Sequence, residues 1–102
     1  MDCLIVRFQF QGELWLYDGP DPWHFVTVPP DISEAIRDHG TPPRSRFGSV
    51  RVTATVGNTS WDTSMFPDKK LGTLVLPVKA AIRVGEALEA GEILTVYVEV
   101  VS

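Results

Sequence analysis

Few side chains in this sequence have the chemistry that an enzyme needs. The chain contains two histidines, His24 and His39. His24 lies between Trp23 and Phe25 in an alternating segment, so its ring should project from the opposite face of a strand to both aromatic rings. His39 follows a short helical pattern, and an imidazolium near a helix C-terminus is favoured by the helix dipole. No serine nucleophile elbow, His-Glu-x-x-His pair or phosphate-binding glycine loop occurs in the sequence. We therefore expect a protein that is not an enzyme.

Basic side chains are better candidates for a binding site. Lysine and arginine are concentrated between residues 41 and 83, although the formal net charge of the chain is −4. Lys79 and Arg83 would share one face if their segment is helical. An arginine beside a lysine can hold a carboxylate or a phosphate, and the arginine can do so with two hydrogen bonds. We expect Arg46, Lys79 and Arg83 to bind a small anionic ligand at a barrel mouth.

Aromatic side chains could line such a mouth. Small barrels bind ligands at their open ends, between aromatic residues and a few polar groups. Trp23 and Trp61, together with Phe25, are the candidates for this lining. The alternative is that these rings fill the core, and that the bases pair with acidic side chains at Glu86, Glu89 and Glu92.

Two other classes of binding protein compete with the anion hypothesis. In the first, basic residues at 44–46 and 69–70 meet near Arg51 and bind nucleic acid, although the net charge opposes non-specific association. A homodimer would double such a patch. In the second, exposed aromatic side chains and an edge strand bind a protein partner or a second copy of the chain.

Composition sets further expectations. Apolar residues make up 44% of the 102 residues, which is typical of one globular domain spanning residues 1–102. Cys3 is the only cysteine and gives no metal-site spacing, so we expect no metal and no cofactor. No apolar run is long enough to cross a bilayer, and residues 1–12 lack the pattern of a signal peptide. We expect a cytoplasmic protein without membrane contact.

Alternation of apolar and polar residues predicts about six antiparallel strands. One long strand carries Phe8, Phe10, Leu14 and Leu16 in a single phase, with a bulge or bend expected at Gly12. Further strands are predicted at residues 23–28, 50–56, 60–65 and 73–77, and a last one after Gly91 and Glu92. Residues 67–72 read as a loop. Many short strands at this spacing are typical of a small barrel.

Two short helical segments complete the predicted fold. Asp31 and Glu34 are spaced as a capping box at the start of the first helix, which should cover one end of the barrel. Gly40 is placed to end it. Residues 79–84 can form a second, shorter helix that ends at Gly85.

The order of these features resembles the DUF1905 family of small bacterial and archaeal proteins of unassigned function. The resemblance rests on residues 23–29 (WHFVTVP), 50–57 (VRVTATVG), 63–67 (TSMFP), 72–79 (GTLVLPVK) with Arg83, and 90–96 (AGEILTV). It implies a small closed or double-split β-barrel. The turn at Gly91 and Glu92 is similar to the Gly-Asp turn of cradle-loop barrels, which include dimeric DNA-binding regulators. Glutamate replaces the usual aspartate, and its longer side chain should be less suited to cap the turn.

Overall fold

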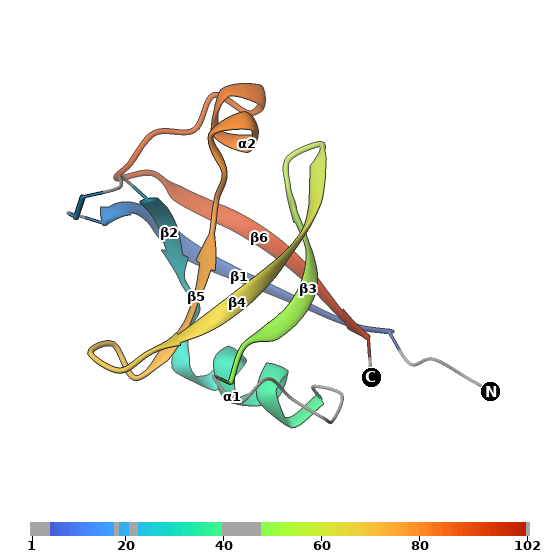
Figure 1. Cartoon of the computed structure of the whole chain (residues 1–102). Helices are drawn as coiled ribbons and strands as arrows, with labels where there is room; N and C mark the ends of the chain where they lie inside the picture. Colours follow the sequence, from blue (N-terminus) through green and yellow to red (C-terminus); the bar gives the residue numbers. More distant parts are fainter. Residues whose placement is uncertain (1–4, 18, 21–22, 40–47, 102) are drawn as a thin grey trace.

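The computed structural model describes residues 5–17, 19–20, 23–39 and 48–101. Within them the chain forms β1 (Ile5–Tyr17), β2 (Trp23–Thr27), α1 (Pro30–His39), β3 (Val50–Val56), β4 (Thr59–Asp68), β5 (Thr73–Pro77), α2 (Ala80–Gly85) and β6 (Ile93–Val101). Figure 1 shows the strands wrapped around a common interior, with α1 at one end and α2 at the other.

The strands close into an antiparallel barrel in the order β1-β2-β5-β4-β3-β6. Closure depends on β1, which pairs with two neighbours in succession. Its residues Ile5 to Glu13 pair with β6, and its residues Leu14 to Tyr17 pair with β2. The predicted fold, a mainly β closed barrel of six strands with two short helices, is confirmed within the described residues.

The interior is filled by the apolar phase of the strands, as the alternation predicted. Every second residue of β3 is buried, and the same is true of β6. Burial of each valine or leucine side chain contributes about 1.5–3 kcal/mol. The buried side chains of these two strands are Val50, Val52, Ala54, Val56, Leu94, Val96, Val98 and Val100.

Helix α1 covers one end of the barrel, but it begins two residues earlier than the predicted cap at Asp31 implies. The Ser33 N–H donates to the Pro29 carbonyl at 2.8 Å, so Pro30 is the first helical residue. Proline suits this position because its missing N–H would have no partner within the helix. Asp31 therefore lies inside the first turn, and the predicted capping box with Glu34 is wrong. Ser33 Oγ in turn accepts a hydrogen bond from the Leu74 N–H at 3.1 Å and ties α1 to β5.

Strand β4 continues through Pro67 and Asp68, where a loop was predicted to begin. Pro67 lies opposite Leu74 in β5. Leu74 directs its N–H to Ser33 and its carbonyl to the Val28 N–H, both away from β4. The pair thus requires no hydrogen bond from the proline, which explains why a residue without an N–H is tolerated in the strand.

The turn before β6 also departs from expectation. Glu92 Oε1 accepts a hydrogen bond from the Glu89 N–H at 2.6 Å, and the Glu92 N–H donates to the Glu89 carbonyl at 3.2 Å. The glutamate side chain therefore caps its own turn, contrary to the expectation for its longer side chain. Gly91 supplies the positive φ of 98° that the turn requires.

Gly12 lies where β1 passes from β6 to β2, and it forms no bulge against β6. The pairing with β6 is continuous from Ile5 to Glu13. A Cβ at Gly12 would lie 2.6 Å from Val26 Cγ1 and 2.7 Å from the Thr27 carbonyl oxygen. The missing side chain is what permits β1 to approach β2 this closely, and the bulge prediction is wrong.

A Gly12→Ala substitution should therefore destabilise the protein by about 1–3 kcal/mol, because the added methyl group meets backbone that cannot move independently. Gly85→Ala is the matched control, since nothing lies within 4 Å of a Cβ there. Denaturant unfolding of both variants measures the difference. Equal free energies of unfolding would contradict the close approach at Gly12.

Candidate functional site

The structure places Lys79 and Arg83 together at the α2 end of the barrel. Lys79 is exposed and precedes α2, and Arg83 is half-buried in its last turn. The Arg83 N–H donates to the Lys79 carbonyl at 3.1 Å, so the two residues lie one helical turn apart. Arg46, the third predicted base, lies outside the described residues.

The two predicted tryptophans lie on opposite sides of the barrel wall. Trp61 points into the interior from β4 and is buried in the core. Trp23 points outward from β2 and is 54% exposed. Trp23 and Trp61 therefore do not line one common site.

His24 lies close to Arg83 at the α2 end. It follows the inward phase of β2, opposite to Trp23 and Phe25 as predicted. His24 Nδ1 and Arg83 Nε are both buried, and neither atom has a hydrogen-bond partner among the described residues. Burial lowers the pKa of His24, and the positive charge of Arg83 lowers it further. A neutral imidazole is thus favoured beside the positive charge of Arg83 at this end of the barrel.

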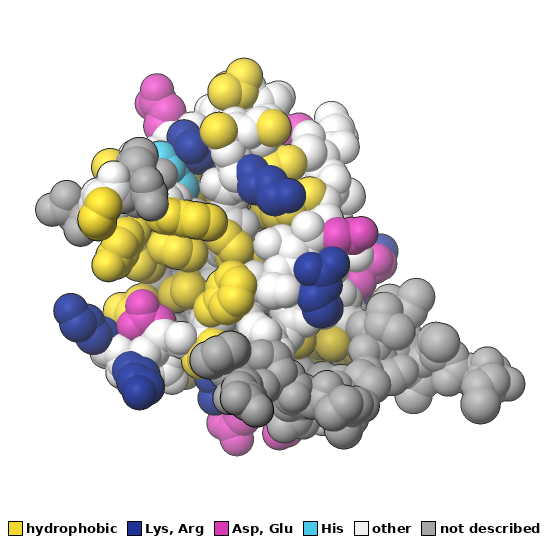
Figure 2. All heavy atoms as spheres, viewed as in Figure 1, with side chains coloured by type: hydrophobic (Ala, Val, Ile, Leu, Met, Phe, Trp, Pro, Cys, Tyr) yellow, Lys and Arg dark blue, Asp and Glu magenta, His cyan; other side chains and the backbone are white. Residues whose placement is uncertain are grey.

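The most distinctive surface lies on the outside of the barrel, where outward-facing aromatic side chains gather. Figure 2 shows it as a continuous apolar area with basic side chains above and below it. We call it the aromatic trough. Its lining residues are Trp15, Tyr17, Trp23, Phe25, Phe66, Pro67, Asp68 and Val75.

The register of β1 and β2 brings four rings of the trough together. Trp15 lies opposite Phe25, and Tyr17 lies opposite Trp23. The ring of Phe25 is 5.3 Å from that of Trp15, 6.4 Å from that of Tyr17 and 6.2 Å from that of Trp23, with which it is stacked. Such pairs add roughly 0.5–1.5 kcal/mol each. The rings therefore hold one another in place while their outer faces stay accessible.

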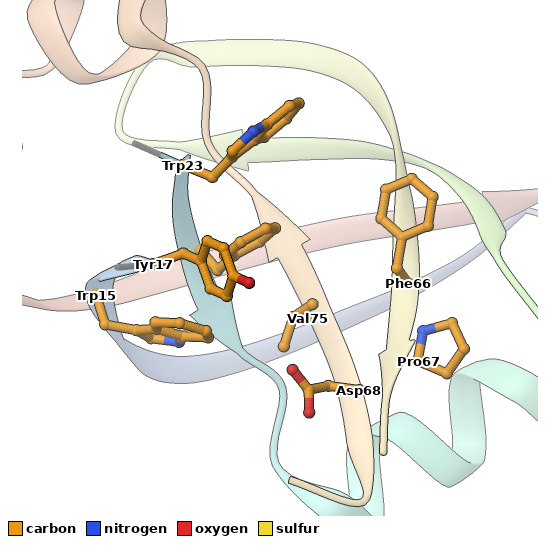
Figure 3. Close-up of a pocket in the computed structure, with 8 residues that line it drawn as sticks. Trp15, Tyr17, Trp23, Phe66, Pro67, Asp68 and Val75 are labelled. Carbon is orange, nitrogen blue, oxygen red and sulfur yellow. The ribbon is translucent and has the colours of Figure 1, made fainter. Parts of the chain in front are cut away.

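Strand β5 forms part of the floor of the trough. All five of its residues are buried, on both faces of the strand. Val75 faces outward and lies opposite Phe66, with an exposed fraction of only 5%. Figure 3 shows Tyr17 and Phe66 on opposite sides of the hollow, with Val75 between them.

The trough consists of two neighbouring hollows. The first has a volume of about 450 Å³ and is lined by the eight residues named above. The second, of about 390 Å³, shares Trp15, Tyr17 and Asp68 with it and adds Thr27, Lys70 and Leu71. The Trp15 indole N–H donates to Thr27 Oγ1 at 2.8 Å and fixes the ring at the junction.

Sequence reasoning identified Trp23 and Phe25 but missed Trp15, Tyr17, Phe66 and Asp68. A usable signal was present, because the outward phase of β1 and β2 carries rings where polar residues are usual. What the sequence did not contain was the pairing of β4 with β5, which brings Phe66 to the same face.

The predicted nucleic-acid patch is only partly described. Arg51 lies on the outer face of β3, where its guanidinium donates to Ser64 Oγ at 3.5 Å. Lys69 and Lys70 lie in the turn between β4 and β5. Residues 44–46 lie outside the described part of the chain.

Comparison with known protein families decides the relationship of this chain. A model of the domain of unknown function DUF1905 matches residues 10–98, which is most of the sequence. The chain belongs to the DUF1905 family. No curated protein matches it.

Among the described residues, no group of three His, Cys, Asp or Glu side chains is placed to hold a metal ion. No described helix is long and apolar enough to span a membrane.

The lowered pKa of His24 predicts a loss of stability in mild acid. The unfolded chain has the ordinary value of 6.5, so below about that pH it binds more protons at this site than the folded DUF1905 domain does. The contribution of His24 to the free energy of unfolding is therefore full above this pH and decreases as the pH falls below it. Arg83→Gln should raise the pKa of folded His24 and so reduce the decrease in the free energy of unfolding at acid pH.

NMR titration of the His24 ring, with denaturant unfolding at several pH values, measures both effects. Lys79→Gln is the control, because it removes the same charge from an exposed neighbour. If Arg83→Gln leaves the pKa of His24 unchanged, the contribution assigned to the charge of Arg83 is contradicted.

Proposed function

We propose that this DUF1905 domain is a non-enzymatic protein-interaction module that binds an extended, proline-rich peptide segment in the aromatic trough. The observation that carries the proposal is the clustering of five aromatic side chains around one hollow on the outer face of the barrel. Tyr17, Trp23 and Phe66 are each about half exposed there. Contiguous exposed apolar patches are typical of interaction sites.

The shape of the trough favours a chain segment over a small molecule. The two hollows follow the outward positions of β2 from Trp23 to Thr27. With a rise of about 3.3 Å per residue, this part of the strand spans roughly 13 Å. A polyproline II segment rises by about 3.1 Å per residue, so about four residues fit along it.

The closed barrel favours side-chain recognition over strand addition. A peptide can join a sheet only at an open edge, and the six described strands close on themselves. Proline-rich segments instead dock between aromatic rings and have little conformational entropy to lose. The rings of Trp15, Tyr17 and Trp23, held by contact with Phe25, provide such a surface.

The three tryptophans allow a direct test. Titration with hexaproline, followed by NMR of the indole N–H signals, should shift Trp15 and Trp23 and leave the buried Trp61 unchanged. Phe66→Ala and Trp23→Ala should each weaken binding by roughly tenfold, since buried aromatic anchors carry much of the energy of an interface.

Tyr97→Ala is the matched control for these variants, because Tyr97 is an exposed aromatic residue on β6 outside the trough. A glycine–serine peptide of equal length should cause no shift. If hexaproline moves none of the indole signals, or if oligothymidylate moves the same two signals instead, the peptide proposal is wrong.

A second candidate function is the binding of a small anion at the α2 end. It is favoured by the buried nitrogens of His24 and Arg83, which have no partner among the described residues and from which an anion could accept hydrogen bonds. Phosphate should then raise the melting temperature of the wild type, more at acid pH than at alkaline pH, because an anion stabilises the protonated imidazole. Arg83→Gln should abolish the effect. Equal stabilisation by chloride at the same ionic strength would count against this site.

A further inference from the structure

The aromatic trough carries one feature that aromatic packing does not explain. Among the described residues that line its first hollow, Asp68 is the single charged one, and it also borders the second hollow. Figure 3 shows the carboxylate between Trp15 and Pro67, turned toward Trp15. A carboxylate beside apolar rings is poorly solvated unless it meets a donor.

Local hydrogen bonds hold this carboxylate in position. Asp68 Oδ1 accepts hydrogen bonds from the backbone N–H groups of Lys70 at 2.9 Å and Leu71 at 3.1 Å. These two hydrogen bonds fix the direction of the Asp68 side chain and engage its Oδ1 atom. Within the described residues no hydrogen bond reaches Oδ2, and neither neighbouring lysine forms an ion pair with Asp68.

We infer that the trough selects a peptide carrying a basic residue, and that Asp68 determines this specificity. The inference rests on the proposed peptide function and adds the charge of the ligand to it. A guanidinium can donate to Oδ2 while it lies against the face of Trp15 or Tyr17, where the electron-rich ring attracts a cation. The same carboxylate repels phosphate, which favours a basic peptide over a nucleic acid.

The test compares two peptides that differ only in charge. One is an oligoproline with a single arginine, and the other carries citrulline, a neutral analogue of the same shape, in its place. The wild type should bind the arginine peptide roughly tenfold more tightly, because hydrogen bonds to charged groups are the stronger ones. Salt should reduce this preference.

The variants assign the preference to one residue. Asp68→Asn retains an oxygen that can accept both backbone hydrogen bonds, so it removes the charge and keeps the turn. It should abolish the preference for arginine. Asp62→Asn is the matched control: Asp62 is an exposed acid on the same strand, bonded to Thr53 Oγ1 and remote from the trough. It should retain the preference.

The outcomes separate the inference from the function on which it rests. If the wild type binds both peptides equally at Trp15 and Trp23, the peptide function stands and the inference is wrong. If neither peptide shifts these indole signals, both are wrong. A preference for arginine that survives Asp68→Asn overturns the assignment to Asp68, and the comparison within the wild type remains valid even if that variant fails to fold.

Discussion

The structure depends on one strand that serves two neighbours. β1 pairs first with β6 and then with β2, so it closes the barrel by joining its two halves. The change of partner occurs beside Gly12, where only a hydrogen atom fits between β1 and the backbone of β2. Just beyond it, Leu14 exchanges hydrogen bonds with the turn before β6: its N–H donates to the Glu92 carbonyl, and its carbonyl accepts from the Gly91 N–H. The remaining strands β5, β4 and β3 lie in that order between β2 and β6, and complete the ring that β1 closes.

Closure also determines where recognition can take place. The six described strands form a closed ring, so the proposed partner would meet side chains on the wall or at the two ends. One end is covered by α1, which inserts Ile36 into the core. The other carries the His24 imidazole and the Arg83 guanidinium. On the wall, the strands that β1 joins present rings instead of polar groups, and β5 is covered from both sides. The trough is thus a consequence of strand order, which sets β1, β2, β5 and β4 side by side.

Local patterns in the sequence were sufficient to predict most strands and both helices. The features that were not predicted depend on pairing between strands that are distant in the sequence. The strand containing Leu74 and the helix containing Arg83 follow from alternation and helical spacing alone. Pro67 was taken as the start of a loop, because its tolerance in β4 depends on hydrogen bonds that Leu74 makes to other elements. The same limit applies to the site. The outward rings of β1 and β2 could be predicted from their phase, whereas Phe66 joins them only through the register of β4 and β5. No local rule brings Asp68 to a cluster of tryptophans.

The pairing of β1 with β6 has a consequence for the time course of folding. The ion pair between Arg7 and Glu99, with 2.6 Å between Arg7 Nη2 and Glu99 Oε2, joins residues separated by 92 positions. Contacts this distant require closure of a long loop before they contribute stability, and proteins rich in them fold slowly. Until β6 is in place, β1 and β3 each present an unpaired edge. A nascent or partly unfolded chain therefore exposes unpaired strand edges and aromatic rings at the same time, and is the species most prone to aggregate.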